Sequence, residues 1–189
     1  MITALAGRAP YRVLCLSGSL RRHSANTALL RAAICLAPAS LSLTLYDGLA
    51  KLPLFNPDDE IEPLPAPIQA LRQAIADSDA LLIACPEYAH GVPGAFKNLL
   101  DWLVSALEFP DKPVALLNAS ARESEHAQAA LREILLTMSA RLVPSASVTV
   151  PLPGAGCEVQ AILDDRAQVA IVSGALAALS AALGGATGG

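Results

Sequence analysis

Residues 80–107 constrain the fold of this 189-residue chain more than any other segment. They open on an uninterrupted apolar run, 80–85, which is typical of a strand buried on both faces of a parallel sheet. A loop bounded by Pro86 and Pro93 follows, and from Ala95 apolar residues recur with a helical period. We therefore expect a strand, a tight loop and a helix, the unit that places ligands at the carboxyl edge of an open α/β sheet. The apolar face expected for that helix consists of Phe96, Leu99, Leu100, Leu103 and Leu107.

Four other segments have the composition of strands, and they fall into two kinds. Residues 12–17 and 113–118 are mostly apolar, which is typical of central strands. Residues 41–46 and 145–150 alternate apolar and polar side chains, which is typical of edge strands. The order 2-1-3-4-5 makes the second and fifth strands the edges, whereas the order 3-2-1-4-5 would place the second strand inside. We therefore predict an α/β three-layer sandwich with a five-stranded parallel sheet in the order 2-1-3-4-5. A single domain is expected over 1–189, with its core over about 11–183.

Charge and apolar content exclude several classes of protein. The chain has a net charge of −4 and no run of Lys or Arg, so we expect no nucleic-acid partner. Apolar residues make up 53% of the chain, yet no apolar run reaches the ~20 residues that cross a membrane. Residues 169–183 come closest, but their large side chains keep helical spacing, so we expect a packed helix and no membrane partner. The first residues lack the pattern of a secretion signal, which favours a cytoplasmic location.

Cysteines and histidines are scattered along the chain. Cys15, Cys35, Cys85 and Cys157 form no CxxC pair, and two of them lie in expected strands, so free thiols in a reducing compartment are predicted. The three histidines are far apart in the sequence and lack ligand spacing, and we expect no metal site.

A second informative segment joins the strand 12–17 to the helix that follows it. Ser17, Ser19, Ser24 and Asn26 supply hydroxyl and amide groups at this junction, and Arg21 adds a positive charge. The unpaired N–H groups and partial positive charge of a helix N-terminus make such a junction a phosphate site. The segment matches neither GxxxxGK[ST] nor GxGxxG, which disfavours a P-loop NTPase and a dinucleotide fingerprint. A plain helix cap at Ser24 is the alternative interpretation.

The two loops together resemble one family. The segment PEYAHGVPGAFKNLLDW, residues 86–102, is similar to the isoalloxazine loop of the NADPH-dependent FMN reductases. These flavodoxin-like enzymes include chromate, quinone and azo-dye reductases. The usual form is PEYN, a spacer, PG and LKNAIDW, and here Ala89 replaces the Asn. The form GSLR, a spacer and SxN is matched by residues 18–26. The resemblance implies a flavodoxin-like fold that binds FMN, with the phosphate in the first loop and the ring against the second.

The resemblance also implies the site residues and the reaction. Many relatives have a glycine-rich turn after the fourth strand, where this chain has Ser120 and Arg122. Relatives pass a hydride from NADPH or NADH to flavin N5, and then to a quinone, free flavin, azo compound or metal oxyanion such as chromate. No catalytic acid, base or nucleophile is therefore expected from the protein, and a homodimer or homotetramer is expected. The implied cofactor contacts are Ser17, Ser19, Arg21, Ser24, Ala25, Asn26, Pro86, Glu87, Tyr88, Ala89, His90, Gly91 and Ser120.

Several alternatives remain open at the level of the sequence. Tyr88 either contacts the flavin or lies at the lip of the pocket, and His90 faces either substrate or solvent. Residues 47–67 form either a solvated acidic connection or a functional loop, and the resemblance of residues 52–57 to the family implies a place near the flavin edge and a partner subunit. Trp102 and Asp101 are expected to pack or cap at a subunit boundary. The competing functions are a flavodoxin-like electron carrier and a module that binds FMN or another phosphate ligand without redox chemistry.

Overall fold

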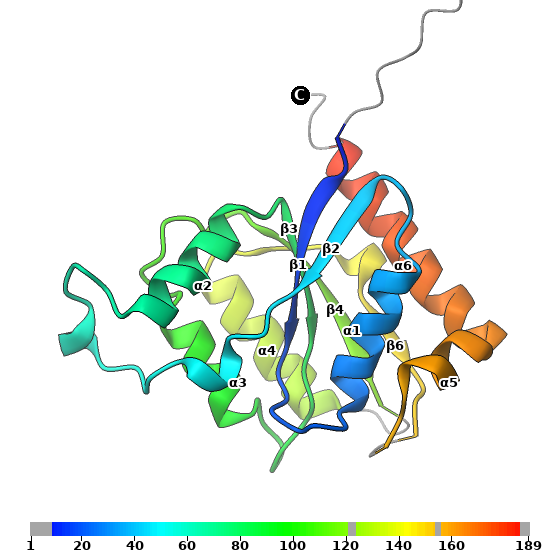
Figure 1. Cartoon of the computed structure of the whole chain (residues 1–189), viewed down its shortest axis with the longest axis horizontal. Helices are drawn as coiled ribbons and strands as arrows, with labels where there is room; N and C mark the ends of the chain where they lie inside the picture. Colours follow the sequence, from blue (N-terminus) through cyan, green and yellow to red (C-terminus); the bar gives the residue numbers. More distant parts are fainter. Residues whose placement is uncertain (1–8, 121–123, 154–155, 186–189) are drawn as a thin grey trace, which may run out of the picture.

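The computed structural model describes residues 9–120, 124–153 and 156–185 and contains one parallel β-sheet (Figure 1). Its strands lie in the order β2-β1-β3-β4-β5, which confirms the predicted topology. The register aligns Val13 with Ala80 and Leu81 with Val114, so the first, third and fourth strands form the buried centre. The four long strands are β1 (Tyr11–Ser17), β2 (Leu41–Leu45), β3 (Ala80–Ala84) and β4 (Pro113–Ala119).

The fifth position of the sheet is divided between two short strands. β5 (Arg141–Leu142) pairs with the beginning of β4, and β6 (Val148–Val150) pairs with its end. A 3-10 turn, Pro144–Ala146, separates them. The strand expected over 145–150 is therefore shorter than expected. Pro144 explains the interruption, because proline has no N–H for the ladder and its fixed φ favours the start of a turn.

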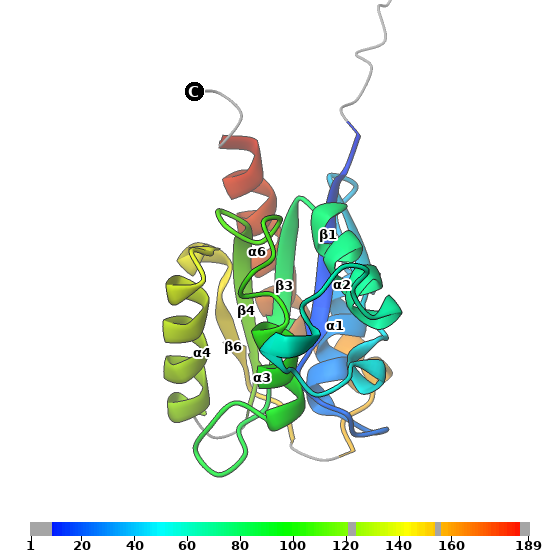
Figure 2. The ribbon, with the colours of Figure 1, turned by 90° about the vertical axis from the view of Figure 1, so that its left-hand side faces the viewer.

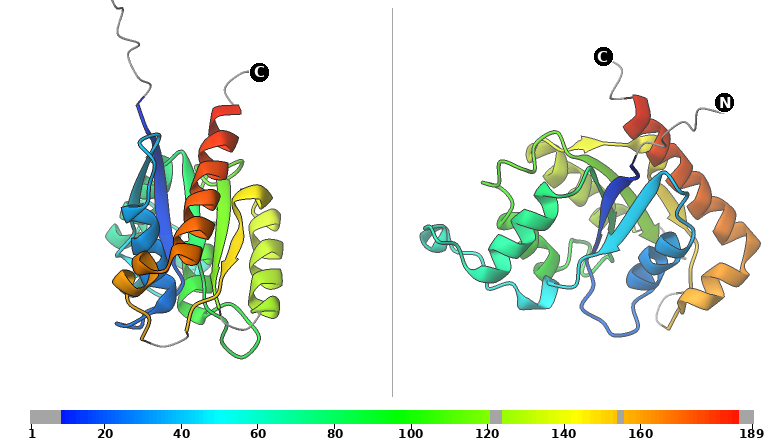
Figure 3. Two further views of the ribbon diagram at one scale, coloured as in Figure 1. Left: turned by 90° about the vertical axis from the view of Figure 1, so that its right-hand side faces the viewer. Right: turned by 45° about the horizontal axis from the view of Figure 1, so that its top comes forward.

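Helices cover both faces of the sheet and form two separate cores (Figures 2 and 3). The core on one side includes Leu29, Leu82 and Leu176, and the core on the other includes Ile68, Leu81 and Phe96. The first face is covered by α1 (Ala25–Cys35), α5 (Val159–Asp164) and α6 (Arg166–Gly185). The second face is covered by α2 (Ala66–Ala76), α3 (Gly94–Asp101) and α4 (Glu125–Thr137).

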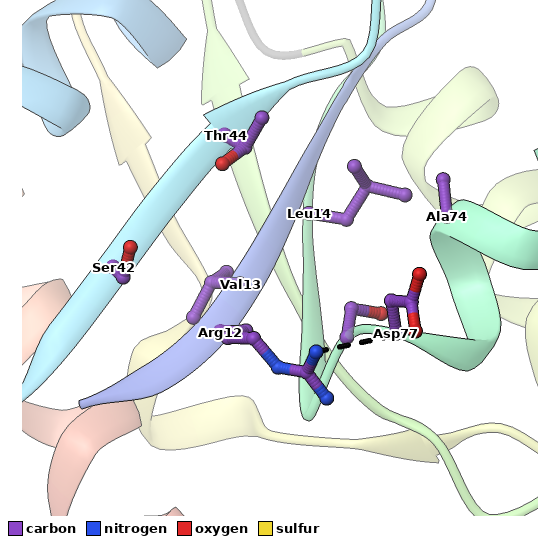
Figure 4. A pocket seen from close by; sticks show the side chains of 8 residues that line it. Arg12, Val13, Leu14, Ser42, Thr44, Ala74 and Asp77 are labelled. Carbon is purple, nitrogen blue, oxygen red and sulfur yellow. Dashed lines mark ion pairs between the residues drawn. The ribbon is translucent and has the colours of Figure 1, made fainter. Parts of the chain in front are cut away.

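The alternating pattern of β2 reflects unequal cover on its two faces. Leu41, Leu43 and Leu45 pack into the core beneath α1. Ser42 and Thr44 are exposed on the other face, where they line a groove with Arg12 and Asp77 (Figure 4). The Arg12 Nη1 and Asp77 Oδ1 atoms are 4.0 Å apart across this groove. Because Arg12 and Asp77 lie near the amino ends of β1 and β3, this groove is remote from the loops that follow the strands.

The helix after the central loop is shorter than its apolar spacing predicted. α3 ends at Asp101, and beyond it backbone N–H groups bond the carbonyl three residues earlier, as Leu103 does with Leu100. A 3-10 turn has three residues per turn, so the face expected from a 3.6-residue period is lost. Leu107 is consequently 91% exposed, which makes its expected place on the buried face wrong.

The long proline-rich segment after β2 is packed against α3. Asn98 fixes its middle, because Nδ2 donates to the Pro53 carbonyl (2.8 Å) and Oδ1 accepts from the Phe55 amide (2.7 Å). Trp102 is fully buried, donates Nε1–H to the same carbonyl (2.9 Å) and packs its ring edge against Phe55. These contacts anchor the segment at Pro53 and Phe55, whereas Leu54 and residues 56–59 are exposed, as expected for a solvated connection. Trp102 packs inside its own chain rather than at a subunit boundary, and Asp101 pairs with Lys97 on the same helix.

α6 has the length and apolar composition of a helix that could cross a membrane, judged on those two properties alone. The core helix of a soluble protein meets the same criteria. One face of α6 is buried in the core that α1, α5 and α6 form against the sheet, as expected for a packed helix. The buried side chains of this face include Val172, Leu176, Leu179 and Leu183.

Candidate functional site

Three loops meet at the carboxyl edge of the sheet, the lower edge in Figure 1. They follow β1, β3 and β4, and together with the start of α1 they enclose a cavity of about 200 Å³. Most of the residues expected to contact a cofactor line this cavity. Those residues are Ser19, Arg21, Ser24, Ala25, Asn26, Pro86, Glu87 and Tyr88.

The first loop is organised by its own hydroxyl groups. Ser17 Oγ lies 2.8 Å from Thr27 Oγ1 and accepts from the Ser19 amide, so Ser17 shapes the loop without lining the cavity. Ser24 is the N-cap of α1, and its Oγ accepts from the Thr27 amide (3.3 Å). The cap interpretation of Ser24 is therefore confirmed, and the residue also forms part of the cavity wall. The amides of Ala25 and Asn26, in the first turn of α1, have no acceptor within the helix and are available to an anion.

Asn26 carries the least satisfied polar atom of this wall. The residue is only 6% exposed, and its Oδ1 is buried without a hydrogen-bond partner in the described part of the chain. A buried polar atom that lacks a partner destabilises a protein by about 1–3 kcal/mol. Because Asn26 lines the cavity, a ligand with a hydroxyl group at this place would donate a hydrogen bond to its Oδ1.

Gly18 lets the first and second loops approach each other closely. Its amide donates to the Ala84 carbonyl (2.8 Å), which continues the pairing of β1 with β3. A Cβ added at Gly18 would lie 2.6 Å from Cys85 Sγ and 3.1 Å from Cys85 Cα, so only glycine fits without a displacement. Burial raises the pKa of the Cys85 thiol to about 12, so this cysteine is a packing residue and not a nucleophile.

The second loop turns sharply at its tip. The amide of Tyr88 bonds the Gly91 carbonyl (3.1 Å), and the amide of Gly91 bonds the Tyr88 carbonyl (3.0 Å). Ala89 and His90 between them have φ values of 50° and 59°. Asn adopts this left-handed region more readily than Ala, which gives a conformational reason for the Asn in the usual family form. Ala89, His90 and Gly91 form this tip and do not line the cavity.

Glu87 joins the second loop to α4. Its Oε2 accepts from the Ala127 amide (2.9 Å) in the first turn of that helix, and its Oε1 lies 3.3 Å from His90 Nδ1. The side chain of Glu87 is 19% exposed, whereas that of His90 is 76% exposed and packs edge-on against the ring of His126. The carboxylate of Glu87 is thus held at the helix N-terminus, where a negative charge is favourable.

The end of β4 and the residue before α4 contribute two residues that were not among the expected cofactor contacts. Ala119 and Ser124 line the cavity, whereas Ser120 does not. Ser120 supports the wall, because its Oγ accepts from Ser124 Oγ at 3.2 Å. A serine directly before a helix is a capping signal, so Ser124 was detectable from the sequence, but Ala119 offers only backbone and carries no such signal. Arg122 lies outside the described residues.

The chemistry of the cavity fits a planar cofactor with a phosphate tail. One end offers small hydroxyls, Arg21 and the first turn of α1, which suit a phosphate group. The other end offers Pro86, Glu87 and Tyr88 of a rigid loop, which suit a flat ring. Among the described residues no group of three His, Cys, Asp or Glu side chains is placed to hold a metal ion.

The fold and this site define a flavodoxin-like flavoprotein. The model of the NADPH-dependent FMN reductase family matches residues 11–153, and the chain belongs to that family. It is an oxidoreductase that works with FMN and NAD(P)H.

Known relatives agree with this assignment. The chain is 36% identical over 162 residues to an NAD(P)H-dependent FMN reductase of Pseudomonas aeruginosa, covering 83% of this chain and 87% of the relative. It is 38% identical over 105 residues to the quinone reductase of Escherichia coli, covering 55% and 54%. Among solved structures, the flavoenzyme NAD(P)H:(acceptor) oxidoreductase FerB of Paracoccus denitrificans superposes with a TM-score of 0.79. That match is 25% identical and covers 93% of this chain and 98% of the other.

Proposed function

We propose that this protein binds FMN in the cavity at the carboxyl edge of the sheet and uses it to reduce quinones and related acceptors with NAD(P)H. The observation that carries the proposal is the buried, unpartnered Oδ1 of Asn26 in the wall of a cavity that also contains a helix N-terminus. Such an atom is expected where a bound ligand completes the hydrogen bonding.

The residues of the first loop would hold the phosphate end of FMN. Ser19, Ser24 and the amides of Ala25 and Asn26 supply short-range donors, and Arg21 supplies the formal positive charge. Ser17 would act through the loop, because its Oγ accepts from the Ser19 amide and pairs with Thr27.

The residues of the second and third loops would hold the ring. The backbone of residues 86–91 is fixed by the Tyr88–Gly91 turn and by the bond of Glu87 to α4, so it presents main-chain groups at constant positions. Tyr88 offers a half-exposed aromatic ring, and Ala119 leaves space beside β4. Ser120 would fix the third loop through Ser124. Bound FMN supplies the hydride chemistry, so the protein needs to bind and orient it and leave one side accessible.

The acceptor is proposed to be a flat aromatic molecule. A second, mostly apolar cavity of about 320 Å³ shares Arg21 and Tyr88 with the first and includes Leu20, Pro93 and Ala95. Apolar walls beside an aromatic ring suit quinones, free flavin and azo compounds. A metal oxyanion such as chromate belongs to the same proposal, as an acceptor that would occupy the same side of the flavin.

Titration of the flavin-free protein with FMN tests this function. We expect the flavin fluorescence to change on binding, and the absorbance near ~450 nm to bleach when NADPH is added without oxygen. Asn26→Ala removes one buried partner and should weaken FMN binding about tenfold, the effect of roughly 1.4 kcal/mol. Ser42→Ala, in the groove of Figure 4, is the control and should bind FMN like the wild type. A protein that neither perturbs FMN nor supports its reduction by NADPH would contradict the proposal.

Assembly and location are proposed on separate grounds. Three large apolar side chains, Leu54, Val104 and Leu107, are exposed on the α3 side, which supports a homodimer or homotetramer. Size-exclusion chromatography with light scattering would measure the mass of the assembly. All four cysteines are free thiols, which supports a cytoplasmic location that fractionation of the source cells would test.

A further inference from the structure

A basic cavity adjoins the proposed phosphate site. It has a volume of about 320 Å³ and lies between the start of α1 and the start of α5. Ser24 belongs to its wall and to the wall of the flavin cavity, so the two cavities adjoin at this residue. The proposed flavin function does not use this basic cavity.

Basic side chains on one wall determine what this cavity can bind. Arg22 and His23 come from the first loop, and Arg31 follows Thr27 by one turn on the same face of α1. In the described part of the chain no ion pair engages the guanidinium of Arg22 or Arg31. The facing wall holds Cys157, Val159 and one acidic residue, Glu158. The balance of charge is positive.

The distribution of charge along the chain supports the same conclusion. The chain has 17 acidic residues and a net charge of −4, yet its first 46 residues contain five arginines and no Asp or Glu. The arginines of this cavity therefore belong to a segment with no acidic partner of its own. A concentration of positive charge on an acidic protein favours the binding of an anion at that place.

We propose that this basic cavity binds the phosphate group of an adenosine nucleotide, carried by NADPH or by FAD. The proposal rests on the flavin function above, because the cavity adjoins the site assigned to the flavin phosphate. A guanidinium fork binds phosphate oxygens through two parallel hydrogen bonds, and Arg22 and Arg31 provide two such forks. The adenosine 2′-phosphate end of NADPH carries the anion that such a pair recognises. The adenylate half of FAD would place a second phosphate directly beyond the first.

Binding of adenosine 2′,5′-bisphosphate to the FMN-loaded protein tests the cavity directly. We expect saturable binding by calorimetry, weakened about tenfold in Arg31→Gln and in Arg22→Gln. Arg166→Gln at the start of α6 is the matched control, since it also removes an exposed guanidinium, and should leave binding unchanged. Binding that is absent, or equal in all four proteins, would overturn the proposal.

Kinetics and flavin titrations distinguish the two sources of the phosphate. If the source is NADPH, the KM for NADPH rises about tenfold in both arginine variants while the KM for NADH stays constant. If the source is FAD, the Kd of the flavin-free protein for FAD rises while its Kd for FMN stays constant. Unchanged FMN binding and NADH oxidation in the variants would leave the flavin function intact even where the cavity proposal fails. A titration of the flavin-free protein with adenosine 2′,5′-bisphosphate would test the cavity even where FMN does not bind.

Discussion

At the scale of single residues, Glu87 is the side chain whose role geometry defines most clearly. A carboxylate beside a redox cofactor invites a role as a general base. Both oxygens of Glu87 are engaged, however, one with the Ala127 amide and one near His90. The carboxylate therefore positions the second loop on α4, and its negative charge stabilises the N-terminus of that helix.

Substitution of Glu87 separates positioning from proton transfer. Glu87→Ala should lower the free energy of unfolding by about 1–2 kcal/mol, since it removes a partly buried acceptor from a backbone N–H. FMN binding should weaken with it. Glu87→Gln keeps an acceptor of the same shape and should restore most of the stability and of the turnover measured with saturating FMN. A pH–rate profile that does not move between the wild type and Glu87→Gln would agree with positioning. A loss of turnover above a hundredfold in Glu87→Gln with FMN bound would show that the carboxylate transfers a proton.

At the scale of elements, the site depends on how closely the loops after β1 and β3 approach each other. Gly18 is the contact point, with Cys85 directly beneath it. Gly18→Ala should destabilise the protein by about 1–3 kcal/mol, because the new Cβ overlaps Cys85 Sγ and backbone. It should also weaken FMN binding, because the first loop must shift. Urea denaturation and FMN titration measure the two effects.

A glycine in open surroundings provides the control for that substitution. Gly174 lies in α6 and has no atom within 4 Å of an added Cβ. Gly174→Ala should stabilise the protein by about 0.5–1 kcal/mol, since alanine is the better helix former.

Adding Cys85→Ala to Gly18→Ala removes the nearest overlapping atom and should recover part of the lost affinity for FMN. Equal stability of the Gly18→Ala protein and the wild type would contradict the close approach.

Elements with a uniform pattern were predictable from the sequence, and interrupted elements were not. The unbroken apolar run of β3 and the alternation of β2 predicted the correct strand order. A central strand of the sheet is buried on both faces, whereas an edge strand is more exposed on one face, and the two residue patterns reflect this difference. The division at Pro144 and the exposure of Leu107 depend on local turns that change the period within a few residues.

The candidate site shows the same division at the level of its loops. The two loops with recognisable residue types, 18–26 and 86–91, were found, and the structure brings most of their residues to one cavity. Ala119 was not found, because a residue that contributes backbone and an open space leaves no mark in the sequence. Ala89, His90 and Gly91 were expected to contact the cofactor, but they form the tip of the loop and do not line the cavity. This turn depends on the left-handed backbone of Ala89 and His90, which no hydrophobic pattern encodes.

At the scale of the whole molecule, the buried thiols of Cys15 and Cys85, one in each core, are expected to make the stability of the protein depend on pH in alkali. Cys15 lies in the core beneath α1 and Cys85 in the core beneath α3, so global unfolding exposes both. Burial raises the pKa of each thiol from 9.0 to about 12. Between these values the unfolded chain releases protons that the folded chain retains, so the free energy of unfolding must fall as the pH rises through that range. Below pH 8 the two states hold the same thiol protons, and the thiols cause no pH dependence.

Urea denaturation of the flavin-free protein at pH 8 and at pH 10 measures this effect. Cys15 and Cys85 should each reduce the free energy of unfolding by about 1.4 kcal/mol at pH 10, one pH unit above the pKa of the exposed thiol. Cys15→Ala destabilises the protein at both pH values by removing a packed side chain, but it should also remove the contribution of this thiol to the difference between them. Cys35→Ala removes an exposed thiol and should leave that difference unchanged. A difference between pH 8 and pH 10 that is the same in Cys15→Ala as in the wild type would show that the thiol of Cys15 ionises equally in the folded and unfolded states. Its burial in the core beneath α1 would then have no effect on stability in alkali.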